Sequence, residues 1–364
     1  MYNQARYERQ MILPGFGEQG QAKLQAARVL VIGAGGLGCP ALSYLAAAGV
    51  GTIGIVDGDS VLLHNLHRQV LFAEADIGKN KALAAAAHLS QLNADIRVLA
   101  FPCYIDVSNA EQLLEDFDII VDGSDNFQCR YLVNDAVVLK NKILVQGAVS
   151  AWEGQVAVFT ASLHYRDLFP EPPPPGSIPH CGEAGVIGYL PGLIGALMAG
   201  EVIQLITGLG SWLRGKILVY DALHHRQMVL DMPAPKEHRN MPADMHAFRH
   251  YNYAFFCGAD AEKLLEPHSL FQLMKAGDIY LVDVREYPEA AREPLPQSRC
   301  LPLSAFDPAQ LPDDDQPVVL VCQTGRRSQS LLHRFPQFLE GSRRVYSLQG
   351  GIEAWNCFLQ SDGQ

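Results

Sequence analysis

A glycine-rich turn follows the first strongly apolar stretch of the chain, in the segment VLVIGAGGLG at residues 29–38. Gly33, Gly35 and Gly38 have the spacing with which a backbone turn approaches a phosphate at the start of a helix. Asp57 closes the next apolar segment, where an acidic side chain can hydrogen-bond a ribose. The pattern predicts a nucleotide site, but alone it does not decide between NAD, FAD, another phosphate and a turn that serves packing only.

Polar residues farther along the chain bear on that choice. They are Asn65 and Arg68, which are one helical turn apart, Lys81 at the start of the next helical segment, and Asp125 and Asn126 after a later strand. A nicotinamide site needs an apolar slot, whereas two cations and an aspartate near a glycine turn suit a triphosphate bridged by Mg²⁺. The alternative is that Arg68 and Lys81 are solvated surface charges.

A second chemical signal lies near the other end of the chain, in VVLVCQTGRRSQSLL at 318–332. Cys322 ends an apolar strand and precedes a helix, whose N-terminus lowers the pKa of a thiol, and Arg326 and Arg327 add positive charge. A persulfide needs such an anion cradle. A phosphatase loop would place an arginine six residues after the cysteine, where this chain has Ser328, so the shorter loop suits sulfur rather than phosphate.

The elements that must position the first set of residues alternate between strand and helix. Strands are predicted at 28–33, 51–59, 96–101, 118–125 and 142–149, and helices at 38–49, 79–93, 111–117 and 127–140. This alternation predicts a Rossmann-like, doubly wound and mostly parallel α/β sheet. The later segments GQVAVFT, GKILVYDAL and HRQMVLDM resemble strands without full crossovers, which predicts a more antiparallel half.

A polar, proline-containing stretch at 232–250 indicates a boundary between domains. Beyond it, apolar strands around 280 and 318 alternate with helical segments, which predicts a second, smaller α/β unit. We therefore expect a first domain over 1–240, a linker over 241–258 and a second domain over 259–364.

Composition excludes several classes of protein. The 364 residues are 48% hydrophobic, which allows more than one large core, and a net charge of −11 argues against a nucleic-acid partner. The apolar run at 190–200 is too short to span a bilayer and the start of the chain has no signal segment, so we expect no membrane partner and a cytoplasmic location. The eight cysteines include no C-x-x-C pair and are typical of reduced thiols.

Six segments of the first domain together resemble a known family. They are RYERQMILPGFGEQGQAKL (6–24), GAGGLG, VDGDSVLLHNLHRQ, IGKNKA, DGSDN and CGEAGVIG (181–188), and they fall in order over nearly all of 1–232. The chain resembles the adenylyltransferases that activate ubiquitin-like sulfur carriers in molybdopterin and thiamine biosynthesis, which are bacterial relatives of ubiquitin-activating enzymes.

The resemblance implies ATP as the nucleotide and a role for each matched residue. Gly36 would let the backbone approach the phosphates, Asp57 would hold the ribose, and Asn65, Arg68 and Lys81 would bind the triphosphate. Asp125 would bind Mg²⁺ and orient the reaction, with Asn126 beside it. Arg9 would reach the γ-phosphate of a neighbouring subunit, which implies a symmetric homodimer.

The chain departs from this family where most relatives carry two C-x-x-C pairs that bind zinc. His164 and Asp167 stand where the first pair is expected, and the region of the second pair has no cysteine. A mixed site of His164, Asp167 and His238 is conceivable, but we expect the fold to need no zinc. Cys181 lies in the segment that crosses the active site in relatives, which implies a thiol that accepts the activated acyl group or forms an acyl-disulfide, and that could act as the resolving thiol. The alternative is a loop cysteine without a role.

The second domain resembles rhodanese sulfurtransferases over about 260–360. The matching pieces are LVDVRE (281–286), the loop at 322–327 that includes Gly325, and LQGGIEAW (348–355). The segment YPEAAREPLPQSRCLPLS after the first piece departs from the family's pattern. Asp283 and Arg285 are expected to be structural, and an inactive rhodanese domain is the alternative to an active one.

Together the two resemblances imply one enzyme with two activities. ATP-dependent adenylylation would activate the C-terminal glycine of a carrier that ends in Gly-Gly, and a Cys322 persulfide would replace AMP to give a thiocarboxylate. The sulfur donor would be a cysteine desulfurase or thiosulfate, and the pathway, whether molybdopterin, thiamine, tRNA thiolation or a related one, stays open. Two alternatives remain: an NAD- or FAD-dependent oxidoreductase with a rhodanese appendage, and a non-catalytic scaffold that docks carriers.

Overall fold

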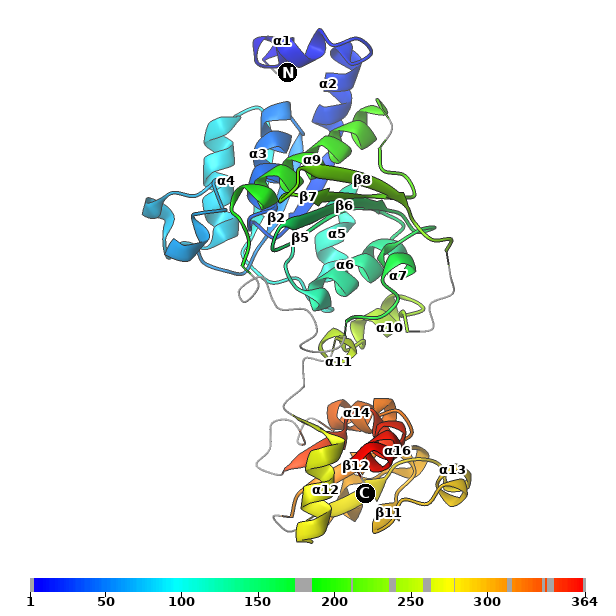
Figure 1. The fold of residues 1–364 in the computed structure, drawn as a ribbon. Coiled ribbons are helices and arrows are strands. Elements are labelled where there is room, and N and C mark those ends of the chain that lie inside the picture. The colour runs from blue at the N-terminus through cyan, green and yellow to red at the C-terminus, as the bar shows by residue number, and fades with distance from the viewer. Residues whose placement is uncertain are drawn as a thin grey trace. The chain divides into compact units, whose positions relative to one another are not determined.

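The computed structural model describes residues 3–173, 185–210, 212–235, 240–257, 263–277, 279–312, 316–335, 338 and 344–362. The chain forms two compact units, Met1–Tyr253 and Ala254–Gln364, each built on its own sheet (Figure 1).

The first unit is built on an eight-stranded sheet with the order β3-β2-β1-β4-β5-β6-β7-β8. The first five strands along the chain pair in parallel and the last three continue the sheet antiparallel, as the sequence predicts. Their bounds are β1 (Arg28–Ile32), β2 (Thr52–Val56), β3 (Arg97–Phe101), β4 (Ile119–Asp122), β5 (Ile143–Ser150), β6 (Glu153–Phe159), β7 (Lys216–Asp221) and β8 (Arg226–Asp231).

Helices cover this sheet on its two faces (Figure 1). Helices α3 and α9 pack against each other, with α9 on β5 and β6, while α5 and α6 pack together below β4 and β5. The helices of the unit are α1 (Gln4–Met11), α2 (Gly17–Ala26), α3 (Gly38–Ala48), α4 (Lys81–Leu92), α5 (Ala110–Glu115), α6 (Phe127–Leu139), α7 (Tyr165–Leu168), α9 (Tyr189–Thr207), α10 (Met245–Arg249) and α11 (Tyr253–Phe256). Neither α1 nor α2 is predicted from hydrophobic periodicity, because both are rich in polar residues.

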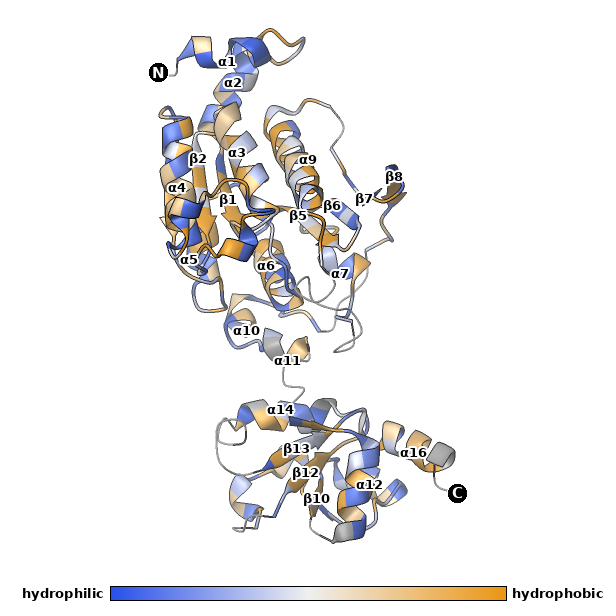
Figure 2. Cartoon of the chain, turned by 60° about the vertical axis from the view of Figure 1, so that its left-hand side comes forward, coloured by the Kyte–Doolittle hydropathy of each residue, from blue (hydrophilic) through white to orange (hydrophobic). Residues whose placement is uncertain are grey.

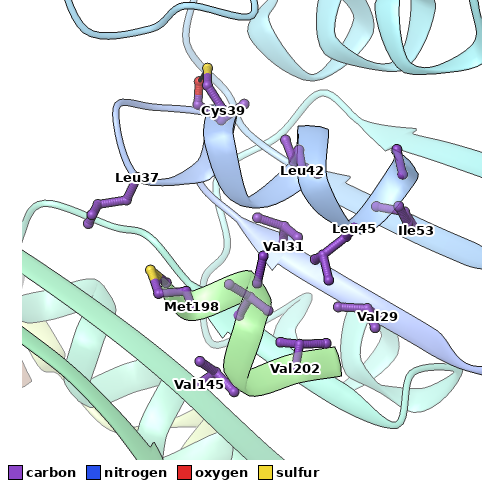
Figure 3. Packing of buried hydrophobic residues seen from close by; sticks show 14 of the residues in the cluster. Val29, Val31, Leu37, Cys39, Leu42, Leu45, Ile53, Val145, Met198 and Val202 are labelled. Atoms are coloured by element: carbon purple, nitrogen blue, oxygen red, sulfur yellow. Dashed lines mark hydrogen bonds between the residues drawn. The ribbon is translucent and has the colours of Figure 1, made fainter. Parts of the chain in front are cut away.

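The core between the sheet and its α3–α9 layer explains why the strands read as continuous apolar runs. Val29 and Val31 of β1 pack against Leu45 of α3 and Val202 of α9, and all four side chains are fully buried (Figure 3). Each such side chain contributes about 1.5–3 kcal/mol when buried. In Figure 2 the central strands of the first unit are coloured as hydrophobic, and so are those of the second unit.

The sequence also predicts an apolar helix around 191–207, and α9 (Tyr189–Thr207) confirms it. Glu201, where the apolar run at 190–200 ends, is half-buried within this helix, and its carboxylate accepts a hydrogen bond from Leu213 N at 2.8 Å. Among the described residues, α9 alone has the length and hydropathy of a membrane-spanning helix, with a mean hydropathy of 1.5. Its contacts with α3, β5 and β6 make it a core helix of the first unit.

The turn between β1 and α3 depends on glycine at two positions. Gly33 has a φ of +87°, and a Cβ on Gly38 would lie 1.8 Å from the carbonyl oxygen of Gly33. We expect Gly38→Ala to lower the free energy of unfolding by at least about 3 kcal/mol, because backbone must move to admit the methyl group. Urea unfolding measures the loss, and Gly192→Ala, where nothing lies within 4 Å of the new Cβ, is the matched control. Equal stability of the two variants would contradict the prediction.

The stretch expected to be a linker, 241–258, contains both α10 and α11. Phe248 and Tyr253 are buried, and α10 packs against α6. Residues 244–253 therefore belong to the first unit. Their aromatic side chains pack on it, which the polar, proline-containing composition of the stretch does not indicate.

The second unit is built on a five-stranded, fully parallel sheet with the order β11-β10-β12-β13-β9. Its strands are β9 (Leu264–Leu265), β10 (Tyr280–Asp283), β11 (Ser298–Cys300), β12 (Val318–Val321) and β13 (Val345–Leu348). Its helices are α12 (Pro267–Ala276), α13 (Tyr287–Arg292), α14 (Arg326–Arg334) and α16 (Gly351–Asp362). The second α/β unit is thus confirmed, although β9, β11 and α13 are too short to show a period in the sequence.

Candidate active sites of the two units

A cavity of about 670 Å³ opens at the carboxyl ends of β1, β2 and β4 in the first unit. Strand β1 lies between β2 and β4, and the sheet continues from β1 toward β3 on one side and toward β5 on the other. Ligands bind at such a switch point, where the strand order reverses. The cavity is lined by seven of the predicted residues: Gly36, Asp57, Asn65, Arg68, Lys81, Asp125 and Asn126. Arg9 lies exposed on α1, away from this cavity.

Asp57 fixes the glycine turn to the end of β2. Its carboxylate accepts hydrogen bonds from the backbone N–H of Ala34 at 2.7 Å and of Asp59 at 2.8 Å. Burial raises the pKa of Asp57, and the nearby Lys81 ammonium and these two N–H donors act in the opposite direction. The side chain expected at the ribose therefore also holds the turn that would meet the phosphates.

Lys81 is buried rather than solvated, which excludes the surface-charge alternative for this residue. Its Nζ lies 2.9 Å from Oδ2 of Asp59, whose other oxygen accepts a hydrogen bond from Tyr104 at 2.5 Å. Burial alone would raise the pKa of Asp59, but the hydrogen bonds from Lys81 and Tyr104 hold it below its usual value. Asp59 was not predicted, although its position two residues after Asp57 was a usable signal.

Two asparagines cap the helices that enter the cavity. The Asn80 Oδ1 accepts a hydrogen bond from Leu83 N, and its Nδ2 donates to the carbonyl oxygens of Asp57 and Asp59. Asn126 caps α6 in the same way, through Cys129 N at 2.9 Å. Asn80, which sequence reasoning missed, therefore holds Lys81 at the first turn of α4.

The segment before α4 forms a polar part of the cavity wall. Asn65 is buried and its Oδ1 accepts a hydrogen bond from Leu62 N, while Arg68 donates to the carbonyl oxygen of His64. Gln69, which was not predicted, is buried in the same wall, and its Oε1 has no hydrogen-bond partner in the described part of the chain. A buried amide oxygen without a partner is costly, so Gln69 is suited to meeting a bound donor.

In the second unit, Cys322 lies directly after β12 and before α14, at the position that the sequence predicts. Its sulfur is buried and lies 3.5 Å from Ser328 N and 3.6 Å from Ser328 Oγ. Gly325 has a φ of +82° at the N-cap of α14, and Ile352 N donates to the Cys322 carbonyl oxygen. The thiol therefore lies at a helix N-terminus whose loop is held against α16.

Arg327 interacts with Cys322, as the sequence leads one to expect, but it also pairs with a carboxylate that the sequence does not indicate. Its guanidinium donates to both oxygens of Glu289, at 2.6 and 2.8 Å. These hydrogen bonds lower the pKa of Glu289 to about 2. Glu289 belongs to α13, inside the segment that departs from the rhodanese pattern, so nothing in the sequence indicated this ion pair.

We expect Glu289→Gln to lower the KM for thiosulfate in a sulfurtransferase assay about fivefold, because a dianionic donor then meets an unneutralised Arg327. Steady-state kinetics with thiosulfate and cyanide measures the change. Glu353→Gln, which removes an exposed carboxylate beside the same loop without releasing an arginine, is the control. An equal effect of both variants would show that only the net charge matters.

The expectation that Asp283 and Arg285 are structural agrees with their surroundings. Both side chains are buried, and Arg285 Nη2 lies 2.8 Å from Asp283 Oδ2. Arg285 also donates to Gln323 Oε1 at 3.2 Å, so the pair supports the residue that follows Cys322.

Two predicted features fall partly or wholly outside the described residues. Cys181 lies in 174–184 and His238 in 236–239, so the structure places neither. Of the other two zinc candidates, Asp167 already accepts a hydrogen bond from His164 N at 2.7 Å, which caps α7. The described residues contain no group of three or more side chains that could hold a metal ion. The side chains that are placed therefore do not fit the zinc that the family implies.

The fold and the cavity define a nucleotide-binding α/β enzyme of the Rossmann-like class. Comparison with known proteins specifies it further: the ThiF family matches residues 7–243 and the rhodanese-like domain matches residues 266–357. The chain belongs to the ThiF family and carries a rhodanese-like domain after it.

Two curated relatives match nearly the whole chain, and a third matches part of it. The probable adenylyltransferase/sulfurtransferase MoeZ of Mycobacterium tuberculosis is 41% identical, over 98% of this chain and 94% of the relative. The adenylyltransferase and sulfurtransferase MOCS3 of Aedes aegypti is 38% identical over 96% and 86%. The sulfur carrier protein adenylyltransferase of Thermus thermophilus is 53% identical over 60% of this chain and 83% of its own. This chain is therefore an enzyme of the adenylyltransferase and sulfurtransferase class.

Solved structures agree on the fold of the first unit. A crystal structure of E. coli MccB with ATP superposes with a TM-score of 0.57 at 25% identity, covering 64% of this chain and 73% of that chain. The class of fold predicted from the sequence is thereby confirmed.

Proposed function

We propose that the first unit adenylylates the C-terminal glycine of a ubiquitin-like sulfur carrier and that Cys322 then delivers sulfur to it. The observation that carries the proposal is the cavity at the β1–β4 switch point, where the glycine turn, Asp57, Lys81 and Asp125 come together. The relatives' names add the sulfur carrier as the class of partner.

The chemistry of the first step follows from charge. A carrier carboxylate oxygen attacks the α-phosphorus of ATP, the bond to the β-phosphate breaks, and pyrophosphate leaves an acyl-adenylate. Carboxylate and triphosphate repel each other, so positive charge and fixed geometry must lower the barrier. Arg68 and Lys81 supply the charge, Asn65 and the glycine turn hold the phosphates, and Gln69 adds a polar contact.

Asp125 is the side chain proposed to hold Mg²⁺. It follows β4, is exposed at the cavity wall, and its carboxylate forms none of the hydrogen bonds or ion pairs seen among the described residues. Carboxylate oxygens are preferred Mg²⁺ ligands, and the ion would neutralise charge on the triphosphate. Asn126, next to Asp125, keeps the start of α6 in place through its cap.

The second step transfers sulfur. The terminal sulfur of a Cys322 persulfide attacks the acyl carbon, AMP leaves, and an acyl-disulfide joins the carrier to Cys322. A thiolate then attacks the Cys322 sulfur, which releases the carrier thiocarboxylate and leaves a disulfide that an external dithiol reduces. Cys181 is the proposed attacking thiol. The persulfide itself comes from a donor such as a cysteine desulfurase or thiosulfate.

A homodimer belongs to the same proposal, because Arg9 lies away from the cavity of its own unit. Its guanidinium would reach the γ-phosphate in the partner's cavity. The two alternatives, an oxidoreductase and a carrier-docking scaffold, are less compatible with a buried Lys81 in the wall of this cavity, since neither needs a cation there.

ATP–pyrophosphate exchange tests the proposal. The purified chain is incubated with ATP, labelled pyrophosphate and each of a panel of small carriers that end in Gly-Gly. Exchange that requires one carrier is expected, and that carrier names the pathway. No exchange with any carrier, together with tight binding of NADH or FAD, would contradict the proposal and indicate that the glycine turn binds a dinucleotide.

A further inference from the structure

Part of the cavity wall in the first unit comes from a stretch of the chain that neither family match covers. The ThiF match ends at residue 243 and the rhodanese-like match begins at residue 266, yet Tyr253 is among the residues that line the cavity. Its side chain is buried. A residue from outside the ThiF match therefore contributes to the site that the matched part of the chain forms.

Tyr253 is held in this wall by a buried ion pair. Its Oη donates to Oδ2 of Asp135 on α6 at 2.7 Å. Arg166 on α7 donates to both oxygens of the same carboxylate, from Nε to Oδ1 at 2.8 Å and from Nη2 to Oδ2 at 2.7 Å. Asp135 and Arg166 are fully buried, so each charge needs the other, and the satisfied carboxylate fixes the position of the phenol.

Further contacts keep the segment before Tyr253 on the first unit. Phe248 on α10 is fully buried, and its ring centroid lies 5.9 Å from that of Tyr253. Arg249, the last residue of α10, pairs with Glu111 on α5. Tyr253 is therefore a fixed part of the cavity wall.

The order of the strands shows which side of the cavity Tyr253 occupies. Asp57 follows β2, the glycine turn follows β1 and Asp125 follows β4, so these groups succeed one another across the sheet. Tyr253 contacts α6, which connects β4 to β5 and packs against both strands. It therefore lies on the β4–β5 side of the cavity, opposite the side expected to hold the ribose.

Three more apolar side chains line the cavity on this side. Leu132 is on α6, Val149 is near the carboxyl end of β5, and Val186 pairs with Ala151 just after that strand. The ribose side, by contrast, carries the charged residues described above. An apolar wall next to the reaction centre suits part of a peptide better than it suits a nucleotide.

The length of α6 indicates which part of a carrier would lie against this wall. A helix rises about 1.5 Å per residue, which puts Leu132 about 10 Å beyond Asp125. An extended peptide advances about 3.3 Å per residue and covers this distance in about three residues. A carrier tail whose terminal carboxylate lies beside Asp125 therefore brings the residue before Gly-Gly to Leu132 and Tyr253.

We propose that Tyr253 is a specificity-determining residue for the carrier: its ring, together with Leu132 and Val186, selects an apolar side chain immediately before the terminal Gly-Gly. The inference rests on the proposed adenylylation, and it names the part of the partner that this cavity recognises. The segment after the ThiF match thereby takes part in binding the carrier.

Carrier-dependent ATP–pyrophosphate exchange by the full chain tests the inference. The probe is the carrier that supports exchange, prepared with Val-Gly-Gly and with Asp-Gly-Gly at its C-terminus. We expect the KM for the Asp-Gly-Gly form to be at least about tenfold higher, because its carboxylate would lose hydration against an apolar wall. Tyr253→Leu is expected to raise the KM for the Val-Gly-Gly form about tenfold and to leave the KM for ATP unchanged.

Two further variants separate this role from a structural one. Tyr253→Phe keeps the ring and loses the hydrogen bond to Asp135, so its KM for the carrier should stay within about threefold of the original value. Tyr131→Leu removes another buried tyrosine, whose ring lies against Arg166 and which is not one of the described residues that line the cavity. It should lower the melting temperature as Tyr253→Leu does, but leave the KM for the carrier unchanged.

The outcomes distinguish the inference from the proposed function. No exchange by the unaltered chain with either form of the carrier would overturn both. Exchange with equal KM values for the two forms would overturn the inference alone, and this comparison does not require that Tyr253→Leu folds. The inference would also be wrong if Tyr253→Leu kept the original KM for the carrier, or if Tyr131→Leu raised that KM equally.

Discussion

Asparagine in place of Asp125 is expected to lower carrier-dependent ATP–pyrophosphate exchange at least about a hundredfold. The substitution keeps the size of the side chain but removes the charge proposed to hold Mg²⁺ beside the triphosphate. Because Asp125 is exposed at the cavity wall, the variant should fold as the unaltered chain does. Initial rates of exchange at saturating ATP and carrier measure the effect.

Asp106 offers a matched control for this experiment. It lines the same cavity, but its carboxylate accepts hydrogen bonds from Ser108 and Asn109 in its own turn. Asp106→Asn should therefore retain most of the exchange. If Asp125→Asn kept half of the exchange rate, Asp125 would have no part in the adenylylation and the metal would need another ligand.

Serine in place of Cys322 is expected to abolish thiocarboxylate formation and to leave ATP–pyrophosphate exchange unchanged. The hydroxyl of serine cannot carry a persulfide, whereas the adenylylation site is in the other unit. Mass spectrometry of the carrier detects the product, because one oxygen is replaced by sulfur. A loss of at least about a thousandfold is expected, which is typical for removal of a nucleophile.

Cys300→Ser is the comparison for Cys322→Ser, since Cys300 lies in the same unit and its thiol donates to the carbonyl oxygen of Arg285. This variant should form the thiocarboxylate at nearly the original rate. Thiocarboxylate formation by Cys322→Ser at the original rate would move the sulfur step to a different thiol and leave the second unit without a chemical role.

The nucleotide cavity could be predicted because its residues follow strands in a fixed order. Gly33 and Asp57 come directly after β1 and β2, Gly36 lies in the same turn as Gly33, and Asp125 follows β4. Parallel strands bring such positions to one edge of a sheet. The alternation of short apolar runs with longer helical segments made the sheet predictable in the same way. Asp59 and Asn80 were missed because their side chains act on neighbours rather than on a ligand.

The parts that could not be predicted depend on pairs that are distant in the sequence. Tyr253 meets Asp135 across 118 positions, and Glu289 meets Arg327 across 38. No local pattern of hydrophobicity or spacing carries such a pair, since either residue alone reads as a solvated polar side chain. The polar composition of 241–253 likewise concealed a segment that packs on α6 through Phe248.

Asp135 and Arg166 form a buried ion pair between α6 and α7, with Arg166 Nη2 2.7 Å from Asp135 Oδ2. Thiolates that join two segments, through a metal or a disulfide, oxidise or exchange with other thiols. Carboxylate and guanidinium groups do neither, so this contact between α6 and α7 does not depend on the redox state of its surroundings.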